Sequence, residues 1–182
     1  MPTTSFVTGA NGHLGNNLVR LLIKKGDRVI AGVRNYNHRN ILSNVDCTIV
    51  PADLTDKASL VKAFVNVDVL YQVGAVFKHW APNPQRDIYD ANMLATQNTI
   101  EAAAEVGVRK IVYVSSLATL DRSHTPITET TWNPDTSNIY FRSKTDSEKL
   151  AWDLSDTLGM KMVSVLPSAM IGENCFSLTP TM

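Results

Sequence analysis

The sequence is poor in cysteine and carries no excess of charge. Its 182 residues include two cysteines, Cys47 and Cys175. Neither belongs to a CxxC pair or a Cys/His cluster, so we expect no disulfide framework and no metal site. Seventeen basic residues balance seventeen acidic ones, so no nucleic-acid or anionic-membrane partner is expected. Binding of a small molecule is the better expectation.

Long apolar runs are also missing from the sequence. No stretch approaches the roughly 18 residues that a membrane span requires, and no basic, apolar leader precedes the first predicted strand. We therefore expect a cytoplasmic protein with no membrane partner. Apolar residues make up 44% of the chain and charged residues 19%, which is typical of one soluble globular domain.

Strand-like and helix-like segments alternate along the chain. Apolar and β-branched runs predict strands at 5–8, 28–33, 46–50, 67–73, 108–114 and 160–166, and apolar spacing predicts helices at 12–25, 57–65, 86–106 and 138–158. This alternation is typical of an α/β fold with a doubly wound parallel sheet, the Rossmann fold, in strand order 3-2-1-4-5-6.

A glycine-rich turn joins the first predicted strand to the first helix. Gly9, Gly12 and Gly15 fall there with the spacing GxxGxxG. Gly9 permits a tight turn, Gly12 lets the main chain approach a pyrophosphate, and Gly15 lets the helix lie close to the strands. An ordinary glycine-rich turn is the alternative, but the strand before it and the amphipathic helix after it favour dinucleotide binding.

Other residues at strand ends bear on the choice of nucleotide. Arg34 lies nineteen residues beyond Gly15, where a fold that prefers NAD carries an acid; a guanidinium there favours the 2′-phosphate of NADP. The alternative for Arg34 is a solvated loop arginine. Asp53 is either an adenine contact or a turn or N-cap residue. Gly74 and Ala75 are small enough for a ribose or phosphate to lie close.

Tyr140 and Lys144 lie one helical turn apart and therefore on one face of a helix. A nearby cation lowers the pKa of a phenol, so we expect Lys144 to bring Tyr140 towards neutrality, where it can exchange a proton with a carbonyl oxygen. Ser116, at the end of the fifth strand, could hydrogen-bond the same oxygen. The pattern is that of a hydride-transfer site.

Together these motifs resemble an extended short-chain dehydrogenase/reductase, in the branch of dihydroflavonol reductase-like and NAD-dependent epimerase/dehydratase proteins. The resemblance covers the whole chain in order. The matching segments are Thr8-Gly9-Ala10-Asn11-Gly12-His13-Leu14-Gly15, Asp53-Leu54, Gly74-Ala75, Asn92, Tyr113-Val114-Ser115-Ser116, Tyr140-Phe141-Arg142-Ser143-Lys144 and Pro167-Ser168-Ala169-Met170-Ile171-Gly172.

The resemblance implies an NADP-linked oxidoreductase in which Ser116, Tyr140 and Lys144 form the catalytic triad. Tyr140 would be the acid/base, Lys144 would hold the nicotinamide ribose, and Ser116, with Ser115 as its rival, would position the carbonyl. Asn92 would support the site, unless it is an ordinary helix-face asparagine. The implied cofactor contacts are Gly9, Asn11, Gly12, His13, Leu14, Gly15, Arg34, Asp53, Leu54, Gly74, Ala75, Tyr140, Lys144, Pro167, Ser168 and Ala169.

Members of this family normally continue into a smaller substrate domain. We therefore expect an NADP-binding domain at 1–166 and, at 167–182, the start of a truncated substrate-binding region. The expected activity interconverts a carbonyl and an alcohol. The alternatives are a nucleotide-sugar epimerase or dehydratase, which usually retains NAD, and a non-catalytic NADP-binding regulator. Many members pair through two long helices, here 86–106 and 138–158, which would give a homodimer.

Overall fold

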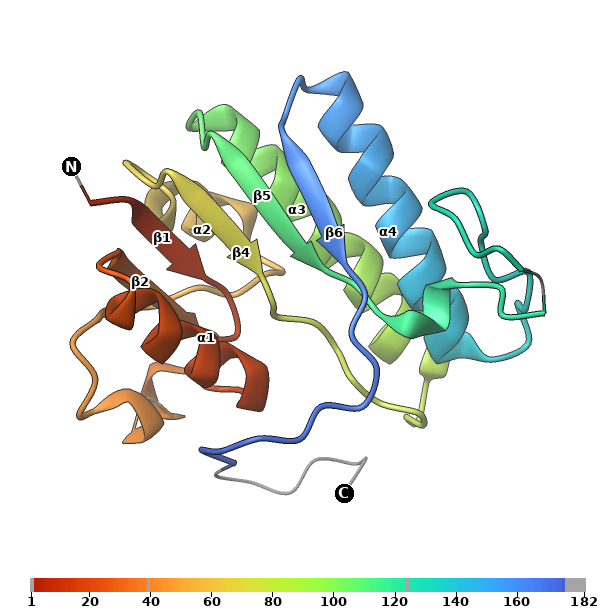
Figure 1. Cartoon of the computed structure of the whole chain (residues 1–182), viewed down its shortest axis with the longest axis horizontal. Helices are drawn as coiled ribbons and strands as arrows, with labels where there is room; N and C mark the ends of the chain where they lie inside the picture. The colour runs from red at the N-terminus through yellow and green to blue at the C-terminus, as the bar shows by residue number, and fades with distance from the viewer. Residues whose placement is uncertain (1, 39, 124, 176–182) are drawn as a thin grey trace.

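A single parallel sheet organises the molecule. The computed structural model describes residues 2–38, 40–123 and 125–175, and its six strands lie in the order β3-β2-β1-β4-β5-β6 (Figure 1). This confirms the predicted fold class and strand order. The strands are β1 (Thr4–Val7), β2 (Arg28–Val33), β3 (Thr48–Pro51), β4 (Val69–Gln72), β5 (Lys110–Val114) and β6 (Met162–Val165).

Helices follow the strands as predicted, with bounds shifted by a few residues. The α-helices are α1 (His13–Lys24), α2 (Lys57–Ala63), α3 (Ala91–Glu105) and α4 (Ile139–Thr157), and the short helices are η1 (Tyr36–His38), η2 (Asn40–Leu42), η3 (Gln85–Asp90) and η4 (Leu117–Thr119). In the part of the chain that the structure describes, no helix combines the length and apolar character that crossing a bilayer requires.

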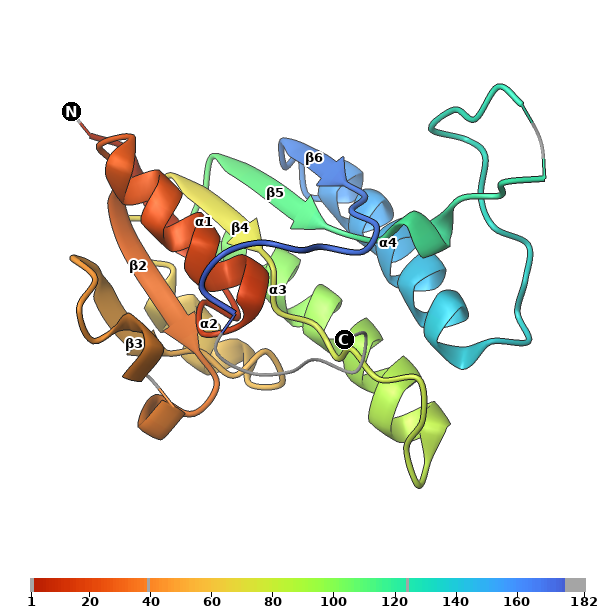
Figure 2. The same cartoon turned by 60° about the horizontal axis from the view of Figure 1, so that its bottom comes forward.

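The two faces of the sheet are covered unequally. α1 lies on one face, and α2, α3 and α4 lie on the other (Figures 1 and 2). Phe6, Leu70 and Ile111 are buried in the core on the three-helix face. Beyond the reach of α1, Val163 and Val165 of β6 are 40% and 48% exposed, so α1 covers only its own half of the sheet.

Two predicted segments differ from the structure. The helix predicted at 86–106 begins as a π-helical turn, η3, and continues as the α-helix α3 from Ala91. The segment 117–134, where no strand or helix is predicted, holds η4 and a β-bridge between Leu120 and Trp132. Sequence periodicity does not distinguish a π-turn from an α-helix, because both place apolar residues on one side.

Local hydrogen bonds explain where the helices begin. The side chain of Asn138 accepts hydrogen bonds from the backbone N–H groups of Tyr140 and Phe141, as expected for an N-cap. Asp56 caps α2 in the same way by accepting from Ser59 N. The Asn138 cap fixes the start of the helix that carries Tyr140.

The close packing of Gly15 yields a stability prediction. Alanine would ordinarily favour a helix by about 1 kcal/mol over glycine, but a Cβ at Gly15 would lie 2.2 Å from Gly9 O. Because this overlap is with backbone, we expect Gly15→Ala to lower the free energy of unfolding by about 2 kcal/mol net, measured by urea denaturation.

The matched control for Gly15→Ala is Gly107→Ala. Gly107 has φ of +75° but nothing within 4 Å of a Cβ, so that variant should lose only about 1 kcal/mol through backbone strain. A Gly15→Ala chain at least as stable as the parent would contradict the packing argument.

Candidate active site

The turn after β1 is built by close backbone contacts. Gly9 has φ of +60°, and a Cβ there would lie 2.8 Å from Gly74 Cα. A Cβ at Gly15 would lie 2.9 Å from Ala10 Cα as well as 2.2 Å from Gly9 O. The tight turn at Gly9 agrees with the prediction, whereas Gly15 packs against the turn itself rather than against the strands.

The Thr8 hydroxyl joins the ends of β1 and β4. Its oxygen accepts hydrogen bonds from Val73 N at 3.0 Å and Gly74 N at 2.9 Å, and it donates one to Gln72 Oε1 at 3.0 Å. Gln72 Nε2 in turn donates to Gly74 O at 3.1 Å. These bonds fix the two turns where the helices pass to opposite faces of the sheet, which is where open α/β sheets bind ligands.

The start of α1 fits a phosphate group. Gly12 is its N-cap and is exposed, no side chain caps this helix in the described structure, and its first turn holds no acid. Such a helix start offers backbone N–H groups and a positive dipole end to an anion. The predicted contacts Asn11, His13 and Leu14 lie on or beside this turn, so the residues present are suited to a dinucleotide pyrophosphate.

Arg34 follows the last residue of β2 and is exposed at the carboxyl edge of the sheet. The neighbouring Gly32 accepts a hydrogen bond from Ala10 N at 3.0 Å, through its backbone oxygen. Arg34 therefore lies beside the glycine turn, at the place expected for a residue that recognises the adenosine ribose.

Asp53 acts as a turn residue in this structure. Its Oδ1 accepts hydrogen bonds from Thr55 N at 2.9 Å and Thr55 Oγ1 at 2.8 Å, which is the pattern of an Asx turn. Leu54 lies next to the glycine turn, because its Cδ1 would be 3.1 Å from a Cβ at Gly74. Leu54 O also accepts from Asn98 Nδ2 at 2.9 Å.

Aromatic side chains surround the Tyr140 phenol. The ring centroids of His79, Phe77 and Phe141 lie 5.0, 5.3 and 6.1 Å from that of Tyr140, all edge to face. Phe77 and His79 belong to the loop after β4, and Tyr140 is 7% exposed. The aromatic loop is therefore part of the wall around the phenol.

The pKa of Tyr140 is shifted in the direction opposite to the prediction. Burial raises the pKa of the phenol, and a hydrogen bond with the Ser116 side chain lowers it in part. We predicted a lowered pKa from Lys144, but the loss of water around the ring outweighs other influences. A phenol with a raised pKa keeps its proton at neutral pH.

Lys144 lies beside the end of β4. Its side chain is buried, at 5% exposure, and it lines a small cavity together with Gly74, Ala75 and Asn92. Burial lowers the pKa of Lys144 to about 8, and the charge of Glu148, one turn further along α4, acts in the opposite direction. The structure thus brings Lys144 to the small residues predicted to lie near a ribose or phosphate.

The two adjacent serines after β5 have different partners. Ser116 Oγ accepts a hydrogen bond from Ala118 N at 3.1 Å. Of the two serines, Ser116 is the one whose side chain lowers the pKa of Tyr140 in part. Ser115 is buried, at 5% exposure, and its Oγ donates to Glu148 Oε2 at 2.5 Å. The geometry therefore favours Ser116 over Ser115 for the serine position of the triad.

Asn92 links three segments around the site. Its Oδ1 accepts from Val76 N at 2.8 Å, and its Nδ2 donates to Val76 O and to Ser143 Oγ, both at 3.1 Å. Asn92 is 3% exposed, so it is not a helix-surface asparagine. It ties α3 to the loop after β4 and to the turn of α4 between Tyr140 and Lys144, which is a supporting role.

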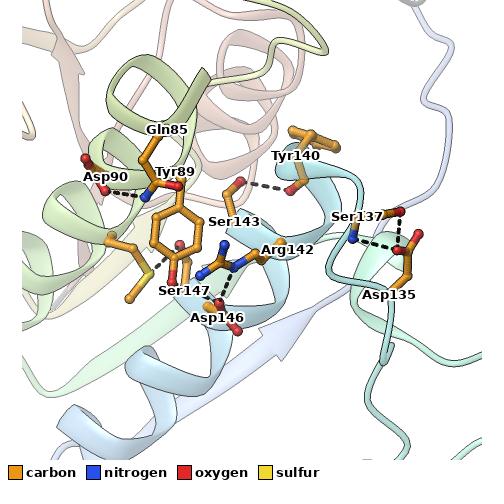
Figure 3. Close-up of polar contacts among 11 residues, drawn as sticks. Gln85, Tyr89, Asp90, Asp135, Ser137, Tyr140, Arg142, Ser143, Asp146 and Ser147 are labelled. Carbon is orange, nitrogen blue, oxygen red and sulfur yellow. Dashed lines mark hydrogen bonds and ion pairs between the residues drawn. The ribbon is translucent and has the colours of Figure 1, made fainter. Parts of the chain in front are cut away.

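The side of α4 away from the sheet is braced against η3 (Figure 3). Tyr89 Oη donates to Asp146 Oδ2 at 2.9 Å, and the Arg142 guanidinium lies 4.6 Å from the centroid of the Tyr89 ring. Ser143 Oγ donates to Tyr140 O at 2.8 Å. Together with the Asn138 cap, these contacts hold the first turns of α4 in place.

The segment after β6 runs across the carboxyl ends of the strands towards α1 (Figure 2). It starts at Pro167, whose carbonyl accepts from Leu117 N at 3.0 Å, and it carries the predicted contacts Ser168 and Ala169, both exposed. Asn17 Nδ2 donates to Glu173 O at 2.8 Å. Of the predicted region 167–182, residues 176–182 lie outside the described residues.

Sequence reasoning missed several residues that shape the site. Glu148 carries a signal, since it stands one helical turn after Lys144, but its bond to Ser115 joins segments that are 33 positions apart. The contact of Asn17 with Glu173 and that of Tyr89 with Asp146 depend on tertiary placement, and no sequence pattern indicates them.

Comparison with known proteins agrees with this architecture. The model of the NAD dependent epimerase/dehydratase family matches residues 5–181. The chain is 31% identical over 174 residues to sterol demethylase protein B of Methylococcus capsulatus, which covers 93% of this chain and 52% of that protein. It is 32% identical over 183 residues to cinnamoyl-CoA reductase 1 of Petunia hybrida, covering 91% of this chain and 54% of that protein.

A solved structure shows the same fold at similar identity. The crystal structure of gox2253 superposes with a TM-score of 0.87 and 32% sequence identity, over 98% of this chain and 55% of that one. The chain thus spans about half the length of the curated relatives it matches.

Burial of Lys144 yields a second stability prediction. Its pKa is about 8 in the folded chain against an ordinary value of 10.5, so the unfolded chain binds the proton more tightly and the charged lysine costs stability below about pH 8. Because Lys144→Met abolishes this titration, we expect the free energy of unfolding of the parent, relative to that of Lys144→Met, to be about 1–3 kcal/mol lower at pH 7 than at pH 10.

The pH dependence separates this charge effect from packing. The parent chain regains stability as the pH rises from about 8 to 10.5, so the difference in stability between Lys144→Met and the parent should shift in favour of the parent over that window. Urea denaturation at pH 7 and pH 10 measures the difference at each pH. A difference that is equal at the two pH values would contradict the prediction.

Proposed function

The chain belongs to the NAD dependent epimerase/dehydratase family, and from this premise we propose that it binds NADP and supports hydride transfer between a carbonyl compound and its alcohol. The observation that carries the proposal is the position of the buried Tyr140 phenol beside the aromatic loop after β4, at the same sheet edge as the uncapped start of α1. The proposed class is a carbonyl reductase or alcohol dehydrogenase similar to the dihydroflavonol reductases.

The glycine turn and α1 would seat the pyrophosphate. Gly9 and Gly15 have no room for a Cβ because they pack against backbone, which keeps the turn tight. The exposed Gly12 at the start of α1 would let the backbone N–H groups of the helix meet the ligand. Arg34, exposed at the end of β2, would bind the 2′-phosphate through its guanidinium. Lys144 would reach the nicotinamide ribose beside Gly74 and Ala75, whose cavity it lines.

Tyr140 would move the proton. When bound, the reduced cofactor supplies the hydride. Because burial raises the pKa of Tyr140, its hydroxyl carries a proton at neutral pH and can donate it to the carbonyl oxygen. Ser116 would donate a hydrogen bond to the same oxygen and stabilise its developing negative charge. A protonated phenol suits the reduction of a carbonyl better than the oxidation of an alcohol.

Two other functions are less well supported. A nucleotide-sugar epimerase or dehydratase usually retains NAD, and the exposed Arg34 favours NADP instead. A non-catalytic NADP-binding regulator would have no need for the set of Ser116, Tyr140 and Lys144 that this chain carries.

The cofactor choice is tested at Arg34. We expect NADPH to bind at least tenfold more tightly than NADH, and Arg34→Gln to weaken NADPH binding by about 10- to 100-fold while leaving NADH unchanged, since hydrogen bonds to charged groups contribute about 1.5–3 kcal/mol. Fluorescence titration measures both. Arg28→Gln, which removes the same charge from the opposite end of β2, is the control. Tighter binding of NADH by the parent would overturn the assignment.

The catalytic role is tested at Tyr140. Tyr140→Phe should lower the rate of NADPH-dependent reduction of aldehydes and ketones by about 100- to 10,000-fold, because the proton donor is lost, while NADPH binding stays. Tyr71→Phe is the control, since its ring packs in the core on the α1 side. If reduction proceeds equally fast in Tyr140→Phe and the parent, Tyr140 is not the proton donor.

A further inference from the structure

Two buried polar side chains accompany Lys144 inside the sheet-helix interface. Glu148 of α4 is 3% exposed and Ser115, directly after β5, is 5% exposed, close to the 5% of Lys144 itself. Burying an ionised side chain costs free energy unless a partner compensates it. A carboxylate and an ammonium buried at one place therefore require a structural reason.

The relative positions of Lys144, Glu148 and Ser115 supply that reason. Lys144 and Glu148 are four residues apart on α4, which places their side chains on one helix face with Cβ atoms about 5–6 Å apart. Ser115 Oγ donates a hydrogen bond to Glu148 Oε2 from the neighbouring strand end. The carboxylate is thus fixed from β5, and not only by its own flexible side chain.

Few other ionisable groups face this pair from the elements packed around it. On α4 the next is Tyr140, one turn before Lys144, whose phenol faces the aromatic wall. From β5 comes Tyr113, which is buried and whose hydroxyl is hydrogen-bonded to Thr96 of α3. The cavity wall beside Lys144 is otherwise neutral, and its further polar members are Gln72 of β4, Asn92 and Thr96 of α3 and Ser147 of α4. Within the described part of the chain, Glu148 is thus the acidic group available to Lys144.

We propose that Glu148 is the positioning residue for Lys144: its carboxylate, held by Ser115 at the end of β5, keeps the Lys144 side chain charged and directed to the end of β4. The proposal rests on the proposed NADP-binding function, in which Lys144 is the group that reaches the nicotinamide ribose. It also gives the two adjacent serines different roles, because Ser115 would position Lys144 through Glu148 and Ser116 would act together with Tyr140.

The charge balance agrees with this role. Burial lowers the pKa of Lys144 to about 8 and the charge of Glu148 raises it, so the lysine retains its proton at neutral pH with Glu148 in place. Removal of the carboxylate would let the lysine lose its proton at lower pH. A neutral amine would then bind the ribose hydroxyls without the added strength of a charged donor.

The experiment follows the Lys144 ammonium directly. Chains labelled with ¹³C at the lysine ε-carbon are titrated by NMR without ligand, and the Lys144 signal is assigned by its loss in Lys144→Met. Glu148→Gln preserves the size of the side chain and an oxygen that can accept the Ser115 hydrogen bond, so it removes the charge alone. We expect the midpoint for Lys144 to move to lower pH by about 1.

Two further variants serve as controls. Glu101→Gln removes a carboxylate of α3 that is paired with Lys57 of α2, and it should leave the Lys144 midpoint unchanged. Ser115→Ala keeps the Glu148 charge but removes its anchor, and it should move the midpoint less than Glu148→Gln does. A Lys144 midpoint that is unchanged in Glu148→Gln overturns the proposal.

A measurement on the parent chain keeps the proposal testable if Glu148→Gln does not fold. The ¹³C signal of the Glu148 side-chain carboxyl should be that of an ionised group at pH 7; the signal of a neutral acid would overturn the proposal. NADPH titrations then test the functional consequence: the affinity of Glu148→Gln should fall about tenfold between pH 6 and pH 8, while that of the parent should fall only about twofold, as expected for a Lys144 pKa of about 8. Failure of the parent chain to bind NADPH would contradict the proposed function, whereas the Lys144 midpoint tests the pairing by itself.

Discussion

The site depends on the contact between the ends of β1 and β4. There the Thr8 hydroxyl bonds to the backbone of Val73 and Gly74, and Gly9 approaches Gly74 so closely that neither turn could carry a larger residue without moving. This contact forces the chain after β1 to turn sharply into α1 and the chain after β4 to turn away. The space between the diverging chains is where the candidate cofactor contacts gather.

α4 places the two candidate site residues that it carries in two different surroundings. Tyr140 is directed to the aromatic rings of Phe77 and His79, and Lys144 is directed to the small residues Gly74 and Ala75. The helix is fixed for this purpose by its Asn138 cap and its contacts with η3. A ligand that contacts both residues must extend from the β4 turn to the aromatic side chains around Tyr140. A nicotinamide riboside has a polar ribose for the first place and a flat aromatic ring for the second.

Much of this fold and part of this site follow from local sequence patterns. The strand order and the six strands follow from alternation and from the glycine turn, and the cap at Asn138 follows from its place before an apolar helix. The pKa direction of Tyr140 does not, because the helical spacing to Lys144 does not show how deeply the phenol is buried. The π-turn at η3 and the bond between Ser115 and Glu148 depend on packing between distant segments, which no local pattern encodes.

The burial of Lys144 shows a conflict between stability and function. The lowered pKa of Lys144 means that its charge costs stability at neutral pH, and the charge of Glu148 offsets part of that cost. A charged lysine at this position is explained if its charge contributes to binding. The buried Glu148 and Ser115 beside Lys144 support this explanation, because a side chain that only packed in the core would need no polar partners. The polar groups in the core of α4 are therefore best explained together, as one arrangement that supports a charged group at the carboxyl edge of the sheet.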